Sequence, residues 1–339
     1  MTEQYDLITI GGGSGGVAAS RRAAEYGARV VIIEKGRMGG TCVNVGCVPK
    51  KIMWYAESLA HEIHEAPDYG FDVSVGGQDW GELKRRRDAY IKRLNDIYEN
   101  NLTANKVRII QGEARFENSN TVRVGELSLT APHIIIATGG EPRVPDLDWA
   151  GLGITSDGFF ELTERPASVA IVGAGYVGVE LAAVLAALGS KVSICARYDS
   201  LLRSFDEMLQ RAVVGAFKSD GVELNCHATV ERVERGKDGL TLHTEDQRSV
   251  GPVDCVIWAV GRRPLTGSLE LENTDVSLDE SGFIPVDDYQ ATNADGIYAI
   301  GDVTGRLALT PVAIAAGRRL SDRIFGGMSD RHLDYTNVP

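Results

Sequence analysis

Residues 5–34 read YDLITIGGGSGGVAASRRAAEYGARVVIIE. An apolar run, Tyr5–Ile10, enters a glycine-rich turn, which is followed by an alanine-rich stretch, Val17–Tyr26, and a second apolar run, Ala28–Glu34. This order predicts a strand, a tight turn, a helix and a parallel strand. The chain is therefore expected to open with an α/β unit of the doubly wound, Rossmann-like kind.

The turn has the spacing Gly11-x-Gly13-x-x-Gly16. In such a turn the first glycine permits the sharp bend, the second lets the backbone approach a pyrophosphate, and the third packs the helix on the strand. The free N–H groups at the start of the helix favour an anion at that place. Glu34 follows Gly16 by 18 residues, where a carboxylate can hold a ribose hydroxyl. The pattern predicts an adenine dinucleotide without a 2′-phosphate, and FAD is the natural candidate.

The same order of elements returns 162 residues later. The strand Ser168–Val172 leads into a second glycine turn, then a helix to Leu188 and a strand, Lys191–Ala196. The turn carries glycines at the matching positions, Gly173, Gly175 and Gly178. Where the first unit has an acid, this unit has Ala196, followed by Arg197 and by Arg203. Guanidinium groups bind a 2′-phosphate that a carboxylate would repel, so the second site is predicted to hold NADPH.

The two units divide the chain into domains. We predict an FAD domain over residues 1–145, an NADPH domain inserted over 146–264, and the rest of the FAD domain over 265–339. Further expected elements are a helix over 79–101, a strand over 133–137, a hairpin-like region over 222–250, strands over 253–260 and 296–300, and a helix over 311–325.

Composition and charge limit the function. The chain has 339 residues, with 35 basic and 47 acidic side chains and a net charge of −12. An acidic chain lacks the basic face that a nucleic acid requires, and the longest apolar stretch, Val177–Leu188, is too short for a membrane span. No nucleic-acid or membrane partner is predicted. The first residues do not resemble an export signal, and five cysteines do not suggest a secreted disulfide framework, so a reducing cytoplasm is expected.

Two cysteines, Cys42 and Cys47, lie five residues apart just after the first unit. If the segment is helical, their side chains lie about one turn apart and could close a strained, exchangeable disulfide. Lys50 and Lys51 would favour a thiolate at Cys47. A zinc site would need further ligands; His61 and His64 are expected to be solvated helix residues, and no metal is predicted. The other cysteines, Cys195, Cys226 and Cys255, are expected to be buried small hydrophobic residues.

Two nucleotide units flanking Cys42-Val-Asn-Val-Gly-Cys47-Val-Pro-Lys50, together with a late Gly301-Asp302, resemble the flavin-dependent disulfide reductases. The resemblance implies that NADPH reduces FAD, that FAD reduces a Cys42–Cys47 disulfide, and that the dithiol reduces the substrate. Cys47 would face the flavin and Cys42 would attack the substrate.

The resemblance also implies roles for further residues. Lys50 would lie by the flavin and pair with Glu180, and Tyr176 would move aside for the nicotinamide. The residues implied to hold FAD are Gly11, Gly13, Ser14, Gly15, Gly16, Glu34, Thr41, Thr138, Gly139, Asp302 and Thr310. Those implied to hold NADPH are Gly173, Gly175, Gly178, Arg197, Arg203 and Arg262.

The acceptor that the resemblance implies is glutathione disulfide, an anionic peptide, which places the chain in glutathione metabolism and redox homeostasis. The residues that match glutathione contacts are Ser14, Arg21, Tyr98 and Arg318. Two alternatives stay open. The chain could pass electrons from NADPH to another acceptor, such as a quinone, a dye or a metal ion, or it could be a catalytically incomplete nucleotide-binding fragment.

Two positions depart from the pattern of the family. Gly178 stands where many members have alanine, and the chain stops at Asp334–Pro339, where the family begins a C-terminal interface domain. That domain supplies the contacts of a homodimer and the histidine that protonates the leaving thiolate. We therefore expect a chain without the usual dimerisation domain, and none of its six histidines has the setting of that acid.

Overall fold

The computed structural model describes residues 2–338, which divide into two compact units. The first unit contains the residues up to Asn44, Tyr90–Glu141 and those from Arg263 onward. The second contains Val45–Ala89 and Pro142–Arg262. The predicted domain boundaries at 145 and 264 stay a prediction.

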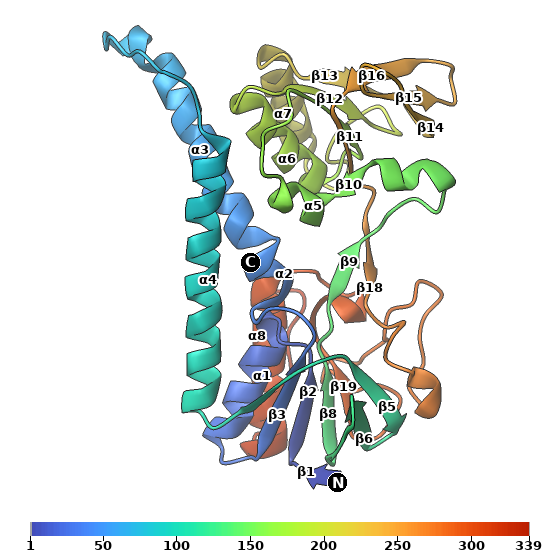
Figure 1. Ribbon diagram of the computed structural model, residues 1–339. Helices are drawn as coiled ribbons and strands as arrows, with labels where there is room; N and C mark the ends of the chain where they lie inside the picture. Colours follow the sequence, from blue (N-terminus) through green and yellow to red (C-terminus); the bar gives the residue numbers. More distant parts are fainter. Residues whose placement is uncertain (1, 339) are drawn as a thin grey trace. The chain divides into compact units, whose positions relative to one another are not determined.

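The first unit is built on a sheet of five parallel strands in the order β19-β8-β2-β3-β4 (Figure 1). These strands are Ile297–Ala299, His133–Ile136, Leu7–Ile10, Val30–Glu34 and Arg108–Gln111. A second sheet has the order β1-β7-β6-β5, with strands Thr2–Gln4, Leu127–Thr130, Thr121–Val124 and Ala114–Asn118. The helices are α1 (Ser14–Glu25), α2 (Gly40–Asn44), α8 (Thr310–Phe325) and the part of α4 (Trp80–Ala104) from Tyr90 onward.

Alternate side chains of the parallel sheet point to opposite layers. Ile8, Val31 and Ile33 are buried against the second sheet, whereas Leu7 and Ile32 are buried against α1 and α8. The strands are apolar on both faces because both faces are covered.

The second unit, like the first, has a central parallel sheet with helices on one face and a second sheet on the other. Its parallel sheet has the order β10-β17-β11-β12-β13, with strands Ile154–Thr155, Cys255–Trp258, Ser168–Val172, Lys191–Cys195 and Glu223–Asn225. One face packs against helices, and the other packs against an antiparallel sheet of β14, β15 and β16. The helices are α3 (Cys47–Glu65), α5 (Ser156–Glu161), α6 (Tyr176–Ala187) and α7 (Glu207–Ser219), and the antiparallel strands are Val230–Arg235, Leu240–Thr244 and Ser249–Val253.

In both parallel sheets, the strand before the glycine turn has two neighbours. One is the next strand of the same unit, and the other is a strand from much later in the chain. In the first unit β2 lies between β3 and β8, and in the second β11 lies between β12 and β17. A strand with a sequence neighbour on one side and a late strand on the other marks a topological switch point, where a crevice at the carboxyl ends of the strands can hold a ligand. Each glycine turn lies at such a point, so both sequence-predicted nucleotide units have the topology that a dinucleotide site requires.

The structure confirms the α/β fold and nearly all of the expected elements. The segment from Cys42 to Cys47 is not one helix, because α2 ends at Asn44 and α3 begins at Cys47. The hairpin-like region is a three-stranded sheet, and its first residues form β13 of the parallel sheet. The remaining short elements are β9 (Gly140–Pro142), which pairs with β18 (Arg262–Pro264), and the 3₁₀ turns Ala66–Tyr69, Asp148–Leu152, Leu271–Asn273 and Gly301–Thr304.

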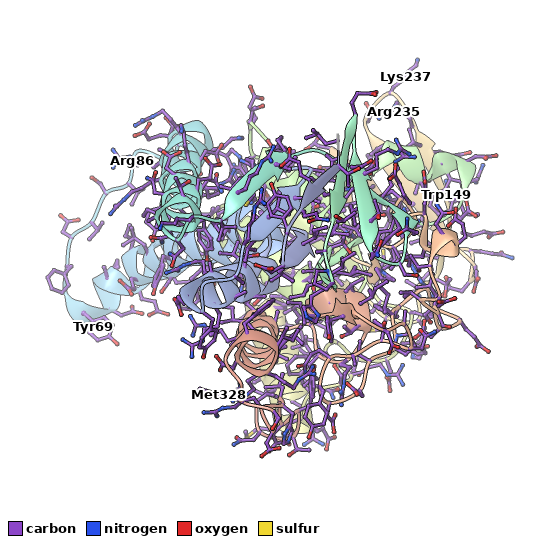
Figure 2. All side chains as sticks on the ribbon, turned by 90° about the horizontal axis from the view of Figure 1, so that it is seen from below. Tyr69, Arg86, Trp149, Arg235, Lys237 and Met328 are labelled. Carbon is purple, nitrogen blue, oxygen red and sulfur yellow. The ribbon has the colours of Figure 1, made fainter. Side chains whose placement is uncertain are left out.

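No helix within residues 2–338 combines the length and the apolar character needed to cross a bilayer. Several exposed apolar side chains lie on α3 and in the segment just after it, among them Tyr69, which is 79% exposed and is labelled in Figure 2.

Arg87 is a buried cation within the second unit. Its side chain is 2% exposed, and its guanidinium donates to Asp88 at 2.7 and 2.9 Å, to the Phe160 carbonyl at 2.5 Å and to the Met53 sulfur at 3.3 Å. These contacts tie α4 to α3 and to α5. The next residue, Arg86, is a surface residue that pairs with Glu82 (Figure 2).

Replacement of Arg87 by alanine should lower the free energy of unfolding by about 2–4 kcal/mol, because it leaves the Phe160 carbonyl without its donor and opens a cavity. Arg86→Ala is the matched control and should cost at most about 1 kcal/mol, since it removes an exposed ion pair. Urea unfolding of both variants measures the difference. Equal losses of stability would contradict the structural role given to Arg87.

Candidate active site

The first glycine turn is held by close backbone packing within the first unit. Gly11 has φ of +108°, and a Cβ added there would lie 2.3 Å from the Ala137 carbonyl oxygen. A Cβ at Gly16 would lie 2.0 Å from the Gly11 carbonyl oxygen. Only glycine fits at both places. Helix α1 begins directly after Gly13 with no side-chain cap and no acid in its first turn, so its N–H groups are available to an anion.

Glu34 closes the far side of this turn. Its Oε2 accepts a hydrogen bond from the Gly12 N–H at 2.6 Å, and its Oε1 accepts one from the Gly36 N–H at 2.6 Å. The carboxylate is thereby fixed at the carboxyl edge of the sheet. Each carboxylate oxygen keeps a further lone pair that can accept a hydrogen bond from a hydroxyl group.

Three further residues predicted to hold FAD, Thr138, Gly139 and Asp302, follow strands at the same edge, whereas Thr41 lies on α2 and Thr310 begins α8. The Ala137 N–H donates to the Ile10 carbonyl at 2.7 Å, and the Ile300 N–H donates to the Ile136 carbonyl at 3.0 Å. Thr138 and Gly139 therefore follow β8, and Asp302 follows β19, beside the turn. The Thr138 hydroxyl is buried without a partner among the described residues. An orphaned hydroxyl beside an uncapped helix end fits a dinucleotide with hydroxyl and phosphate groups.

Helix α2, which carries Thr41 and Cys42, is fixed by two amides that the sequence analysis did not identify. Asn44 donates to the Gly40 carbonyl at 2.9 Å. Asn95, on α4, donates to the Met38 carbonyl at 2.7 Å and to the Asn44 side-chain oxygen at 2.9 Å. Two sequence features point to these residues. Asn44 lies between the two cysteines, and Asn95 is a polar residue at a helical position where the spacing predicts an apolar, buried side chain.

Helix α3 begins at Cys47, which is exposed. Cys42 and Cys47 fall in different units, and their pairing stays a prediction. One turn later, the Lys50 Nζ donates to the Glu180 Oε1 on α6 at 2.7 Å, so the implied contact between these residues is present. The Lys51 ammonium lies over the Trp54 ring, 3.6 Å from its centroid.

The second glycine turn repeats the packing of the first. Gly173 has φ of +121°, and a Cβ there would lie 2.2 Å from the Ala259 carbonyl oxygen. At Gly175 a Cβ would meet nothing within 4 Å. Helix α6 starts at Tyr176, which is 49% exposed, with no side-chain cap and no acid in its first turn. This turn therefore presents free N–H groups and open space, as a pyrophosphate requires.

The loop after β12 folds back over this turn. The Leu202 N–H donates to the Ala174 carbonyl at 2.9 Å, which brings Arg203 next to the glycines. The Arg203 guanidinium stacks on the Tyr198 ring, with its central carbon 3.7 Å from the ring centroid, and Arg197 is exposed two residues after the end of β12. Within the part of the chain that the structure describes, neither arginine forms an ion pair with a carboxylate. Arg262 lies on β18, beyond the end of β17.

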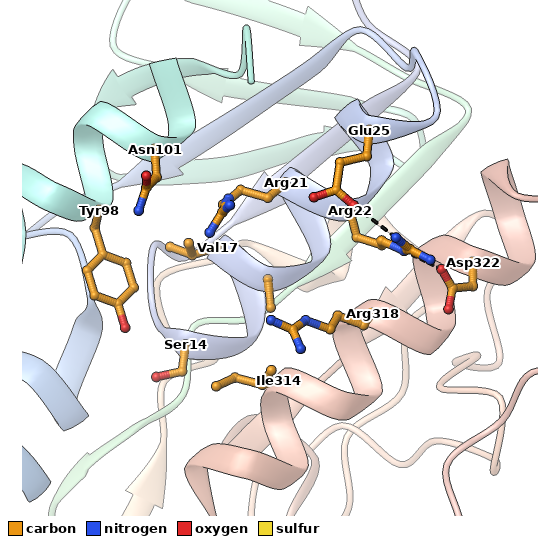
Figure 3. Close-up of a pocket in the computed structure, with 11 residues that line it drawn as sticks. Ser14, Val17, Arg21, Arg22, Glu25, Tyr98, Asn101, Ile314, Arg318 and Asp322 are labelled. Atoms are coloured by element: carbon orange, nitrogen blue, oxygen red, sulfur yellow. Dashed lines mark hydrogen bonds and ion pairs between the residues drawn. The ribbon is translucent and has the colours of Figure 1, made fainter. Parts of the chain in front are cut away.

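A cavity of about 670 Å³ lies in the first unit between α1, α4 and α8 (Figure 3). It brings together Ser14, Arg21, Tyr98 and Arg318, the four residues predicted to contact the acceptor. The two acids in its lining, Glu25 and Asp322, both accept hydrogen bonds from Arg22, at 2.9 and 2.5 Å (Figure 3). The Arg21 Nε is buried and makes no hydrogen bond within residues 2–338. The cavity thus presents positive charge that its own acids do not neutralise.

Tyr98 connects this cavity with Cys42. Burial raises the pKa of the Tyr98 hydroxyl, the nearby Cys42 thiol raises it further, and Arg21 opposes both. A cationic cavity therefore lies next to the first of the two candidate redox thiols.

The other cysteines differ in burial. Cys195 is buried, as expected, and desolvation raises its pKa to about 12. Cys255 is only partly buried, and desolvation raises its pKa to about 11. Cys226 is also only partly buried, so the expectation of a buried small hydrophobic residue is confirmed for Cys195 and not for Cys226 or Cys255. Cys226 directly follows β13, and Cys255 is the first residue of β17. His61 and His64 lie on α3, and the described residues contain no cluster of three potential metal ligands.

Comparison with known proteins gives three consistent findings. Residues 5–317 match the model of the pyridine nucleotide-disulphide oxidoreductase family. The whole chain is 47% identical to a glutathione reductase of Schizosaccharomyces pombe and covers 75% of its length. The fold is similar to that of RclA, an HOCl-induced flavoprotein disulfide reductase of Escherichia coli solved as a Cu(II) complex. The TM-score is 0.87 and the identity 30%, over 98% of this chain and 73% of RclA.

The thiols should differ in reactivity. After reduction, alkylation at neutral pH should label the peptide with Cys42 and Cys47 first, because the raised pKa values of Cys195 and Cys255 keep those thiols protonated. Mass spectrometry of the digested protein measures the order of labelling. Cys195 should react only after unfolding, and labelling of Cys195 ahead of the pair would contradict the assignment.

Proposed function

Because the chain belongs to the pyridine nucleotide-disulphide oxidoreductase family, we propose that it reduces glutathione disulfide with electrons from NADPH. It is an oxidoreductase whose cofactors are FAD and NADPH. The observation that carries the choice of acceptor is the cationic cavity beside Cys42. Glutathione disulfide carries carboxylates at both ends of each peptide half, and Arg21 and Arg318 are suited to bind them.

Each cofactor has its own set of residues in the proposal. FAD is held by the glycines of the first turn and by Ser14, Glu34, Thr41, Thr138, Gly139, Asp302 and Thr310. The glycines of the second turn, with Arg197, Arg203 and Arg262, hold NADPH, and Tyr176 covers the place that the nicotinamide enters. Bound in this way, FAD would supply the two-electron chemistry that links a hydride donor such as NADPH to a disulfide.

The thiol chemistry then balances as an exchange. The thiolate of Cys42 attacks one sulfur of glutathione disulfide, which releases one glutathione thiolate and leaves a mixed disulfide on Cys42. Cys47 attacks the Cys42 sulfur, which releases the second glutathione and re-forms the Cys42–Cys47 disulfide. Lys50, held by Glu180, supplies a fixed positive charge near the first turn of α3. The sum is NADPH, a proton and one disulfide converted to NADP⁺ and two thiols.

We also propose that the chain works in a reducing cytoplasm, because its five cysteines do not suggest a secreted disulfide framework. A homodimer is implied by the resemblance to the family, whose members use the C-terminal interface domain to form it.

Variants of the cysteines and arginines test this function. Cys42→Ser and Cys47→Ser should abolish NADPH oxidation that depends on glutathione disulfide, and NADPH oxidation by a dye should persist. Arg21→Gln and Arg318→Gln should raise the KM for glutathione disulfide by about tenfold or more, because each removes a charge-assisted hydrogen bond. Arg93→Gln, an exposed arginine of α4 outside the cavity, is the control.

Steady-state NADPH absorbance measures all five variants. Turnover of glutathione disulfide by Cys42→Ser would overturn the proposed route. A normal KM in both arginine variants would instead move the acceptor out of this cavity.

Two variants of the second glycine turn form a matched pair that tests the proposed NADPH site. Gly173→Ala should lower the thermal midpoint, since its Cβ meets the Ala259 carbonyl at 2.2 Å. Gly175→Ala has open space and should keep the thermal midpoint, yet weaken NADPH binding by about tenfold, because the methyl group blocks the backbone's approach to the pyrophosphate. Thermal unfolding and NADPH fluorescence titration separate the two effects. Unchanged NADPH affinity in Gly175→Ala would contradict the site.

A further inference from the structure

A second cavity, of about 440 Å³, lies along one stripe of α8 in the first unit. Its lining follows the helical spacing i, i+3, i+4, i+7, i+8 and i+11, and one further residue comes from the segment after the helix. The apolar floor is at the start of the stripe and the charged groups are toward its end. The lining residues are Pro311, Ile314, Ala315, Arg318, Arg319, Asp322 and Arg331.

Three guanidinium groups, those of Arg318, Arg319 and Arg331, line this cavity. In residues 2–338 none of the three forms an ion pair with a carboxylate. Three cations around one cavity repel one another unless an anion lies between them. This is unusual in a chain with a net charge of −12, where acids to pair with them are plentiful.

The one acid of the lining, Asp322, is already engaged. Its Oδ1 accepts from the Arg22 Nε at 2.5 Å and from the Tyr26 hydroxyl at 2.8 Å. Burial raises the pKa of Asp322, but the hydrogen bonds from Arg22 and Tyr26, with the charges of Arg22 and Arg331, lower it overall. A single carboxylate shared with Arg22 does not balance three further cations.

The second cavity shares Ile314, Arg318 and Asp322 with the cavity of about 670 Å³ that is proposed to bind the acceptor, here called the acceptor cavity. Arg318 is therefore within reach of a ligand in either cavity. An anion that engages Arg318 from the second cavity draws the guanidinium away from the first, so the two ligands compete for one group.

We propose that this second cavity is an oxyanion site for a compact, multiply charged carboxylate or phosphate, coupled to the acceptor cavity through Arg318. The coupling rests on the proposed function, whereas the anion site itself does not. Guanidinium groups at several angles match the oxygens of a polyanion, and the floor of Pro311, Ile314 and Ala315 accepts a short carbon skeleton. The anion is either a free small molecule or a carboxylate at the end of the acceptor itself.

The test is calorimetric titration of the full, FAD-loaded chain with citrate, a tricarboxylate probe. Saturating NADP⁺ fills the phosphate-binding turn, so that citrate reports the second cavity. Arg319→Gln and Arg331→Gln should each weaken citrate binding by about tenfold, as expected for loss of one charge-assisted hydrogen bond. Arg93→Gln removes the same charge outside the cavity and should leave the affinity unchanged.

A parallel titration with glutathione disulfide distinguishes the sources. If the anion is a separate molecule, the affinity for the disulfide is normal in Arg319→Gln and Arg331→Gln, and citrate weakens it in the unaltered chain. If the anion is the acceptor's own carboxylate, both variants weaken binding of the disulfide as well. Equal citrate affinity in all four proteins would overturn the site. If citrate binding depends on Arg319 and Arg331 but the unaltered chain does not bind glutathione disulfide, the anion site stands and the proposed function is rejected.

Discussion

The fold depends on the close approach of two backbones at the end of a parallel strand. At Gly11 and again at Gly173, a Cβ would lie within 2.3 Å of a carbonyl oxygen that follows a neighbouring strand. The sharp turn that results starts a helix with its N–H groups uncapped at the carboxyl edge of the sheet. The groups proposed to meet the two pyrophosphates belong to these two turns and to the helix ends that follow them.

The two turns have the same backbone and different chemistry. Glu34 is fixed by two backbone N–H groups at the end of β3, whereas the matching position after β12 is the buried Ala196, followed by Arg197 and the folded-back Arg203. One edge therefore suits a ribose with free hydroxyls and the other a ribose with a phosphate. The difference in charge, not in fold, separates the proposed FAD site from the proposed NADPH site.

Much of this arrangement could be predicted from the sequence because it is local. Glycine spacing fixes the turns, and alternating or continuous apolar runs fix the strands. The break between α2 and α3 was not predictable in this way, since the side chain of Asn44, the last residue of α2, is bonded to the Met38 carbonyl before the helix and to Asn95 on α4. Nor was the arginine cluster of the second cavity, because within residues 2–338 its lack of carboxylate ion pairs depends on Asp322 being held by Arg22 and Tyr26, about 300 residues away in the chain.

The central claim is that electrons pass from NADPH through the flavin to the Cys42–Cys47 pair. Anaerobic titration of the FAD-loaded chain with NADPH, followed by absorbance, tests it most directly. The account predicts loss of the oxidised-flavin absorbance and a new long-wavelength band from a thiolate beside the flavin, which Cys47→Ser abolishes. A flavin that stays oxidised, or a band that persists in Cys47→Ser, would contradict it.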